Sequence, residues 1–266
     1  MRKTLYKTSR HHIVLSGNIL ERREFEKPIF YGFSVDKKRY ISREITPKEK
    51  EENKKRSRNR SRKMVRNLVN SNFGAWIDQR GRPYFSKFLT LTFKDMVVNP
   101  KDANKKFTLF LKRLNYTIFA TKKSIIKYLA VVEFQKRGAV HYHVLLFNLP
   151  YIPKYIDLFN ETWGQGYLWI EKIDNERYAA NYITKYMTKE DNNRLWGEKS
   201  YFCSRNLFRP VVVRESTLCE RVKWLLRSFN PTYQNSFYNE HTGHTKYFCY
   251  DIKNNPNLKD LILSQQ

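Results

Sequence analysis

Two histidines stand two positions apart in the segment VVEFQKRGAVHYHVLLF, residues 131–147, in a chain of 266 residues that has only six. Apolar and β-branched residues on both sides of KRGA indicate two strands joined by a hairpin turn centred near Arg137. Antiparallel pairing then sets Glu133 opposite His141, because both lie four positions from the centre. Side chains alternate along a strand, so His143 shares their face. The pattern predicts that three potential metal ligands converge from two adjacent strands.

Tyrosines recur at every fourth position of a second segment, YAANYITKYMTK. On a helix predicted over about residues 175–189, Tyr178, Tyr182 and Tyr186 leave one face, with Lys185 on its flank. Aromatic residues at helical spacing more often belong to a core, and that alternative stays open. The choice of tyrosine argues for chemistry, because a buried phenol needs a hydrogen-bond partner that Phe or Leu does not need.

The elements that would position these residues follow a regular order. A strand at Tyr84–Phe93 precedes an amphipathic helix that starts at Asn99 and Pro100. The two hairpin strands come next, then a helix over about residues 153–163 and the strand YLWIEKI. This βαββαβ order predicts an α+β fold with a ferredoxin-like core, whose antiparallel sheet carries helices on one face and leaves the other free for a ligand. The tyrosine-bearing helix follows this core.

Length and composition suit one domain with extensions at both ends. Of the 266 residues, 41% are hydrophobic and 15% aromatic, which is sufficient for a real core. We expect a basic amino-terminal extension over residues 1–80, the domain with the histidines and tyrosines over 81–215, and a carboxy-terminal extension of no assigned role over 216–266. Three cysteines at wide spacing suit reduced thiols better than a disulfide framework.

The formal net charge of +26 comes from 51 Lys and Arg against 25 Asp and Glu. It exceeds what solubility requires and predicts a polyanionic partner, of which nucleic acid is the first candidate. A membrane surface is the competing polyanion. However, no apolar run approaches the ~20 residues of a spanning helix, and the start MRKTLYKTSRHH lacks the apolar core of a signal peptide. We therefore expect no membrane partner and a cytoplasmic location.

The densest basic stretch follows a helix start that Thr46, Pro47 and Glu49 predict. From residue 54 to residue 66 the chain has eight basic residues and no acidic one. They are Lys54, Lys55, Arg56, Arg58, Arg60, Arg62, Lys63 and Arg66. A solvated helix face or a flexible arm is the simpler interpretation. The functional interpretation is contact with nucleic-acid phosphates, which releases counterions and gives affinity without sequence preference.

Three segments in order, FLTLTF, HYHVLL and YITKYMTK, resemble the three motifs of the HUH endonucleases. The resemblance is in particular to the rolling-circle replication initiators of small plasmids and single-stranded-DNA phages. It covers about residues 85–210, including the trailing SYFCSRNLFRP, and leaves both ends of the chain uncovered. It implies a ferredoxin-like domain that nicks one DNA strand at a replication origin.

The resemblance implies a metal bound by His141 and His143, with Glu133 as the match for the third ligand. Nitrogen and oxygen ligands together suit Mn²⁺ or Mg²⁺. Such an ion can polarise the non-bridging oxygens of a phosphodiester and organise it for in-line attack. The expected cofactor is therefore a divalent metal.

The resemblance makes Tyr182 of the Y-x-x-K motif the nucleophile, with Lys185 beside it. Nearby positive charge would favour the phenolate over the phenol, whose reference pKa is ~10. The segment YITKYMTK also fits, residue by residue, the Y-x-x-K-Y-x-x-K pattern of initiators from isometric phages, which have a second active tyrosine. In this chain the second tyrosine would be Tyr186, and Tyr178 lies outside the pattern.

The implied reaction joins the 5′ phosphate of a DNA strand to tyrosine and leaves a free 3′-OH, which can prime synthesis. The covalent intermediate keeps the bond energy, so the same enzyme can rejoin strands without ATP. The implied substrate is single-stranded or origin hairpin DNA. The sequence has no G-x-x-x-x-G-K-[ST] phosphate loop, so a host helicase and a replication polymerase are expected partners. Nothing in the sequence indicates an oligomeric state.

Two other functions stay open. A transposase or a conjugative relaxase uses the same chemistry, although the compact length and the two-tyrosine helix favour replication. A strongly basic DNA-binding protein without catalysis would make the convergence of Glu133, His141 and His143 a coincidence. Neither the origin sequence nor the host can be derived from the sequence.

Several polar residues have simpler interpretations. Glu133 could be a surface carboxylate paired with one of the many lysines, although the hairpin register favours a ligand. Thr90 and Thr92 are equally consistent with ordinary strand residues and with contacts to a DNA backbone. His241 and His244 lack a second matched pair of zinc ligands, so an exposed loop is expected there.

Overall fold

The computed structural model describes residues 7–32, 44–152, 155–173, 176–187 and 199–264. The chain folds into two compact units, one of residues Pro47–Phe208 and one that combines Met1–Thr46 with Arg209–Gln266. Each unit has its own five-stranded antiparallel sheet. Together with the helices, the sheets give the α+β class that the sequence predicts. Among the described residues, no helix is long and apolar enough to span a membrane.

The sheet of the larger unit contains the predicted βαββαβ core. Its strands stand in the order β6-β3-β5-β4-β7, and every neighbouring pair is antiparallel. The strands are β3 (Phe85–Thr92), β4 (Tyr128–Phe134), β5 (Val140–Leu149), β6 (Leu168–Lys172) and β7 (Tyr201–Cys203). The connecting helices are α2 (Pro100–Phe119) and α3 (Tyr155–Trp163). The predicted order of strands and helices is confirmed, and β7 adds a fifth strand at one edge.

Helix α2 begins where the sequence places its start. The side chain of Asn99 accepts the backbone N–H of Lys101 at 2.9 Å, which satisfies one of the amide groups that the first turn leaves without a helical partner. Phe107, Phe110 and Leu114 then lie buried along one stripe of the helix. The apolar periodicity therefore decides which side of α2 packs on the sheet.

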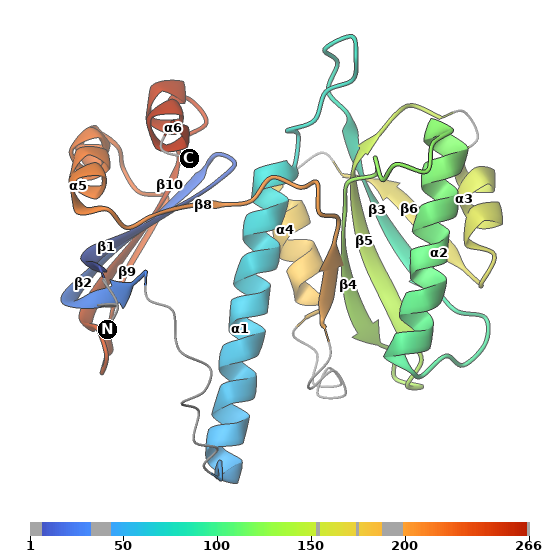
Figure 1. The fold of residues 1–266 in the computed structure, drawn as a ribbon, viewed down its shortest axis with the longest axis horizontal. Helices are drawn as coiled ribbons and strands as arrows, with labels where there is room; N and C mark the ends of the chain where they lie inside the picture. The colour runs from blue at the N-terminus through green and yellow to red at the C-terminus, as the bar shows by residue number, and fades with distance from the viewer. Residues whose placement is uncertain (1–6, 33–43, 153–154, 174–175, 188–198, 265–266) are drawn as a thin grey trace, which may run out of the picture. The chain divides into compact units, whose positions relative to one another are not determined.

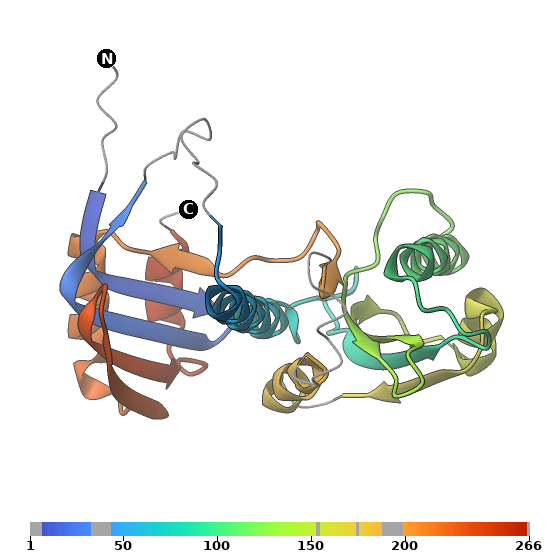
Figure 2. The same cartoon turned by 90° about the horizontal axis from the view of Figure 1, so that it is seen from below.

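Helices cover both faces of this sheet (Figures 1 and 2). On one face, α2 and α3 pack through a core that includes Phe107 and Trp163. On the other face, α1 (Pro47–Asn72) and α4 (Glu176–Lys185) bring Val65 and Ile183 against the sheet. The prediction of a face left free for a ligand is wrong, because that face is itself apolar and gains stability from the burial of both helices.

Helix α1 is a helix of 26 residues that is buried at only one end. It starts at Pro47 as predicted, and its buried residues all lie between Val65 and Asn72. There the Asn72 side chain donates to the Phe208 carbonyl at 2.9 Å and accepts the Phe208 N–H at 2.9 Å. The earlier turns are polar and extend beyond α4 (Figure 1). Packing therefore anchors the carboxy-terminal turns, and the basic turns stay on the surface.

The smaller unit is built from both ends of the chain. Its sheet has the order β8-β1-β2-β10-β9. The strands are β1 (Lys7–Ser16), β2 (Ile19–Tyr31), β8 (Val211–Val213), β9 (Tyr233–Asn239) and β10 (Gly243–Asp251). Helices α5 (Ser216–Leu225) and α6 (Pro256–Leu263) pack on it, with a short 3₁₀ turn, η3 (Leu226–Ser228), after α5.

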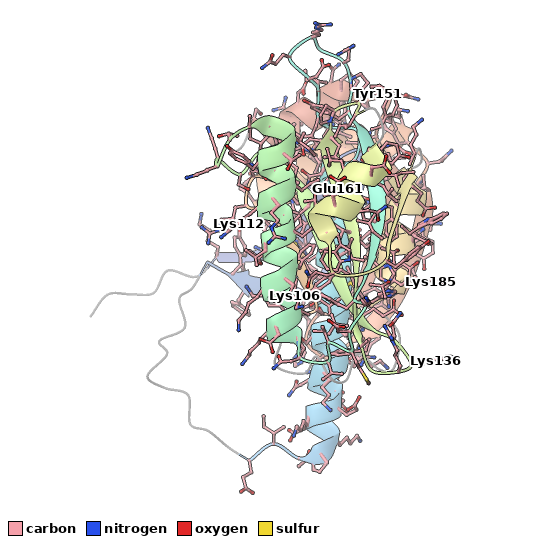
Figure 3. All side chains as sticks on the ribbon, turned by 90° about the vertical axis from the view of Figure 1, so that its right-hand side faces the viewer. Lys106, Lys112, Lys136, Tyr151, Glu161 and Lys185 are labelled. Carbon is pink, nitrogen blue, oxygen red and sulfur yellow. The ribbon has the colours of Figure 1, made fainter. Side chains whose placement is uncertain are left out.

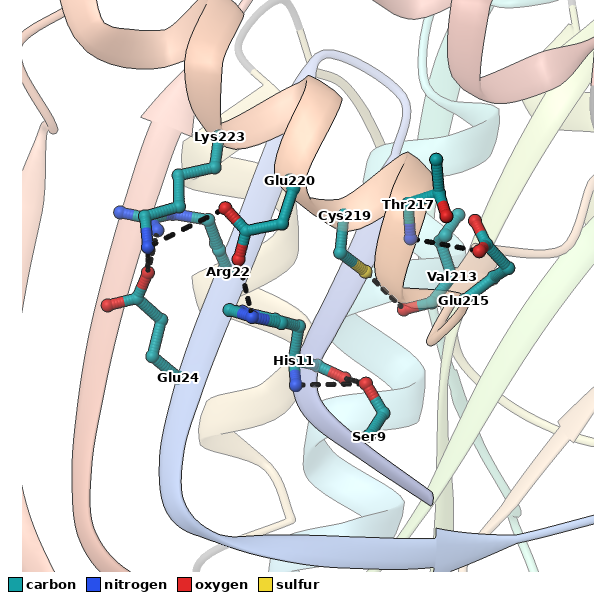
Figure 4. A network of polar contacts seen from close by, with 10 residues as sticks. All are labelled: Ser9, His11, Arg22, Glu24, Val213, Glu215, Thr217, Cys219, Glu220 and Lys223. Atoms are coloured by element: carbon teal, nitrogen blue, oxygen red, sulfur yellow. Dashed lines mark hydrogen bonds and ion pairs between the residues drawn. The ribbon is translucent and has the colours of Figure 1, made fainter. Parts of the chain in front are cut away.

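Polar contacts tie α5 to the first two strands of this sheet (Figure 4). His11 Nε2 lies 2.8 Å from Glu220 Oε1, and Lys223 Nζ lies 2.9 Å from Glu24 Oε1. Buried behind them, the Cys219 thiol points at the Val213 carbonyl, and burial raises the pKa of this thiol to about 12. All three cysteines are free, as the sequence predicts.

The predicted division of the chain treats its two ends as separate extensions, whereas the structure joins them. Strand β10 pairs with β2 from Thr245 opposite Phe25 to Asp251 opposite Ile19. The unit boundaries therefore fall after residues 46 and 208 rather than after 80 and 215. His244 lies on β10 and not in a loop, while His241 lies in the exposed turn before it. Pairing between distant segments leaves no local sequence pattern, which is why it was missed.

Candidate metal centre and tyrosine site

The hairpin of β4 and β5 has the register that the sequence predicts. Glu133 pairs with His141, and Val131 pairs with His143. Along β5 the same alternation continues to Leu145, which belongs to the core under α1 and α4. The two histidines and Glu133 therefore face α4, on the side of the sheet opposite to α2 and α3.

The three side chains form a compact and largely buried group. Glu133 is 4% exposed and His143 is 3% exposed, while His141 is partly accessible. His143 Nε2 lies 2.5 Å from Glu133 Oε2. One ligand atom from each of the three residues lies within 4.8 Å of the other two. Burying a carboxylate is costly unless a proton donor, a positive charge or a metal stands beside it, and here imidazoles fill that role.

Two threonines of β3 orient the histidine rings, and sequence reasoning missed this role. Thr90 stands opposite His143 and Thr92 opposite His141. The Thr90 hydroxyl lies 3.3 Å from His143 Nδ1, and the Thr92 hydroxyl contacts His141 Nε2. Gln135 Nε2 also approaches His141 Nε2 at 3.4 Å. The signal was the matched spacing of T-x-T and H-x-H, which acquires meaning only once β3 and β5 are known to be neighbours.

Two of the three predicted tyrosines meet the histidine group. The ring of Tyr186 stacks on the ring of His143, with centroids 3.4 Å apart and planes 17° apart. Tyr182 stands edge-on to Tyr186 at 5.3 Å and edge-on to Phe88 at 4.8 Å. Both tyrosines also pack against the core beneath α1 and α4. Core packing and proximity to the histidines are therefore properties of the same two rings.

The predicted tyrosine helix is shorter than the sequence pattern suggests. Helix α4 ends at Lys185, and Tyr186 lies in the turn that follows. The prediction that Tyr186 is a helical residue is wrong, but the turn still holds its ring over His143. Burial, and then the hydrogen bond with Tyr182, raise the pKa of Tyr186. The side chain of Tyr178 and residues 188 and 189 lie outside the described residues.

Positive charge lies near the end of α4. Lys185 is exposed in the last turn of α4, where a cation interacts favourably with the helix dipole. Lys136 belongs to the exposed hairpin turn that joins β4 to β5. Both lysines lie on the same side of the larger unit in the view of Figure 3. These two ammonium groups can attract an anion to this part of the unit.

The basic run of residues 54–66 forms a separate surface on α1. Lys55, Arg60 and Arg66 are exposed. Lys54 Nζ lies 3.4 Å from a carboxylate oxygen of Glu51, one turn earlier. The structure thus confirms a helix here and excludes the flexible-arm interpretation for the described residues. It does not bring the run into the histidine group.

The chain is similar to proteins that are named for DNA replication. Residues 86–191 match the model of a family described as replication-associated protein ORF2. Replication-associated protein ORF2 of Spiroplasma virus 4 is 30% identical over 136 residues, which make up 44% of this chain and 42% of that protein. Phasyl DNA replicon protein arp of Escherichia coli is 42% identical over 59 residues, which make up 22% of this chain and 19% of that protein. No solved structure matches.

The similarity falls on the part of the chain that builds the site. The chain spans less than half the length of the curated relatives that it matches. The family match nevertheless runs from β3 to beyond α4 and so includes Glu133, His141, His143, Tyr182 and Tyr186. Residues 86–191 therefore form a segment of the replication-associated protein ORF2 family, which confirms the resemblance to phage and plasmid replication proteins.

Proposed function

We propose that this protein is a rolling-circle replication initiator that nicks and rejoins single-stranded DNA at an origin by metal-dependent tyrosine transesterification. The observation that carries the proposal is the packing of a tyrosine ring on a potential metal ligand, with Tyr186 3.4 Å from His143 between ring centroids. A plain metal-dependent hydrolase has no need of tyrosines there. Both matched relatives carry replication names, which favours replication over transposition or conjugation.

A divalent cation fits the histidine group. Two imidazole nitrogens and one carboxylate oxygen come together within 4.8 Å, and this donor set suits Mn²⁺ as well as Mg²⁺. Glu133, His141 and His143 would hold the ion, with Thr90 and Thr92 fixing the orientation of the imidazoles from the neighbouring strand. When bound, the ion supplies Lewis acidity that stabilises negative charge on phosphate oxygens.

The chain's own groups carry the transfer. In the proposed step the phenol oxygen of Tyr182 forms a bond to phosphorus while the bond from phosphorus to the 3′ oxygen breaks. The phenol gives its proton to solvent, and the 3′ oxygen leaves as the hydroxyl that primes synthesis. The ammonium group of Lys185, three residues on, favours the phenolate form of the nucleophile. Attack by the 3′-OH on the phosphotyrosine reverses the step and rejoins the strand.

Capture of covalently bound DNA tests the proposal directly. The full chain would be incubated with Mn²⁺ and a library of random single-stranded DNA, and DNA that stays attached after denaturation would be sequenced. We expect the attached molecules to share one cleavage junction and to be joined through their 5′ phosphates. The variant with both Tyr182→Phe and Tyr186→Phe is the matched control and should retain none. Absence of attached DNA from the unmodified chain would remove the nicking activity from the proposal.

The basic run on α1 is proposed to bind phosphates without sequence preference. Replacing Lys55, Arg56, Arg60 and Arg66 with glutamine should weaken binding to unrelated single strands about equally. It should also flatten the dependence of log Kd on log salt by about 0.7 for each phosphate that the variant no longer neutralises. Fluorescence anisotropy at several salt concentrations measures both effects.

The control for the α1 variant removes the same charge elsewhere. Four exposed basic residues of the smaller unit serve for this: Arg221, Arg227, Lys246 and Lys253. Their replacement with glutamine should leave the salt dependence steeper than the α1 variant does. Equal slopes for the two variants would show that net charge alone, and not the α1 surface, determines the affinity.

A further inference from the structure

Strand β6 at the edge of the sheet presents a tryptophan on the same face as the histidine group. Along β6, Leu168 and Ile170 turn toward the core with α2 and α3. Side chains alternate along a strand, so Trp169 points to the opposite face. Trp169 pairs with Thr90, and Thr90 pairs with His143 on its other side. Trp169, Thr90 and His143 therefore form one row across three strands.

A second aromatic residue continues this arrangement one row further. Tyr167 comes immediately before β6, and its carbonyl accepts the backbone N–H of Thr92 at 2.9 Å. Thr92 in turn pairs with His141. Two residues before Trp169 in extended chain, Tyr167 lies on the same face as Trp169. Each of the two histidines thus has an aromatic residue two strands away, at roughly 10 Å.

Close approach of the backbone fixes the position of Tyr167. Gly166 has φ of 150°, and a Cβ at this position would lie 2.5 Å from the Thr92 carbonyl oxygen. Only glycine lets the segment run this close to the end of β3. The Lys94 N–H also donates to the Gln165 carbonyl at 2.7 Å. An exposed lysine is thereby placed beside the aromatic pair.

Both aromatic side chains are accessible. Trp169 is 54% exposed and Tyr167 is 62% exposed. Exposure of this size at two residues on one strand is a loss for folding, because neither ring gains much from burial. A ligand with flat, apolar faces would recover that loss. Bases of an unpaired nucleic-acid strand have such faces, and their phosphates suit a chain with a net charge of +26.

We propose that Trp169 and Tyr167 form a stacking platform for the bases of single-stranded DNA next to the phosphate that is cleaved. The proposal rests on the proposed function for the identity of the strand and adds to it the residues that hold the flanking nucleotides. Bases stacked on β6 would align the backbone along the rows that lead to His141 and His143. Stacking tolerates any base, so the platform supplies position rather than sequence choice. Lys94 would contact an adjacent phosphate.

The test compares two ligands that differ only in their bases. One is a fluorescent 20-nucleotide oligothymidine, and the other is a 20-nucleotide abasic strand with the same phosphates. Binding of the full chain is measured in EDTA, so cleavage does not enter the result. We expect Trp169→Ala to raise the Kd for oligothymidine about tenfold or more. Trp169→Phe should raise it less than about threefold, because phenylalanine can still stack, and the abasic strand should bind all variants alike.

Trp224→Ala is the matched control, since Trp224 is a 62% exposed tryptophan of the smaller unit. It should leave both Kd values unchanged. The proposal is overturned if Trp169→Ala leaves the oligothymidine Kd unchanged. It is equally overturned if Trp169→Ala and Trp169→Phe weaken binding by the same factor, or if the weakening is as large on the abasic strand. Because these readouts do not involve cleavage, failure of the platform and failure of the nicking activity are distinguished.

Discussion

Alanine at position 141 is expected to abolish Mn²⁺ binding and to slow nicking of single-stranded DNA by roughly 10²–10³-fold. The physical reason is that His141 supplies one of only three donor groups that lie within 4.8 Å of one another. His141 is also the partly accessible member of the group, so its removal leaves little buried charge unpaired. Calorimetric titration with Mn²⁺ measures the first effect, and a gel assay of nicked oligonucleotide measures the second. Binding of uncleaved DNA should survive.

The result at position 141 is best compared with those of two other variants. His143→Ala should also abolish metal binding, but it strands Glu133, which is 4% exposed, and should therefore lower the stability of the fold as well. His244→Ala is the matched control, because His244 is an exposed histidine on a strand of the smaller unit. If the three side chains are only a buried ion pair with a neighbour, cleavage will continue undiminished in excess EDTA. That outcome contradicts the metal centre.

Removal of one hydroxyl from Tyr182 is expected to eliminate the initial covalent adduct with DNA. Tyr182→Phe keeps the ring and its edge contact with Phe88, at 4.8 Å between centroids, so the fold should change little. What it removes is the oxygen that would attack phosphorus. Denaturing gels should show no shifted protein band, and mass spectrometry of the adduct from the unmodified chain should identify the Tyr182 peptide. An adduct mapped only to Tyr186 or Tyr178 contradicts this assignment.

Tyr186→Phe separates a one-tyrosine mechanism from a two-tyrosine mechanism. After one round of copying, the first tyrosine is still joined to the old 5′ end, and a second nucleophile is needed to cut the regenerated origin. The ring of Tyr186 lies 5.3 Å from that of Tyr182, close enough for both to serve one phosphate after small adjustments. We expect Tyr186→Phe to nick but to fail in the release of circles, with Tyr178→Phe as the matched control. Release at the unmodified rate would falsify the second role.

The metal group could be predicted because its geometry is local. Glu133 and His141 lie on two strands joined by one short turn, so counting from Arg137 fixes which residues pair. The spacing of Tyr182 and Tyr186 was equally visible, although the end of α4 at Lys185 was not. A change from helix to turn depends on what packs around the last residues and not on their periodicity.

The remaining parts of the site depend on contacts between distant segments. Thr90 gains its role only because β3 lies between β5 and β6, and the same neighbourhood brings Trp169 into the row of His143. No pattern within β3 or β6 states which strand will be its neighbour. The covering of the histidine face by α1 was hidden for a similar reason, since its apolar residues occupy only the last turns of a long basic helix.

Pairing of β2 with β10 also sets the order in which the two units can form during synthesis. Phe25 must wait for Thr245, which leaves the ribosome 220 residues later. At ordinary elongation rates this delay is roughly 10 to 40 seconds. The strands of the larger unit are all made within that interval. The larger unit can therefore close on a nascent chain while β1 and β2 still lack their partners, and a ribosome that stops early would release the histidine group without a finished second unit.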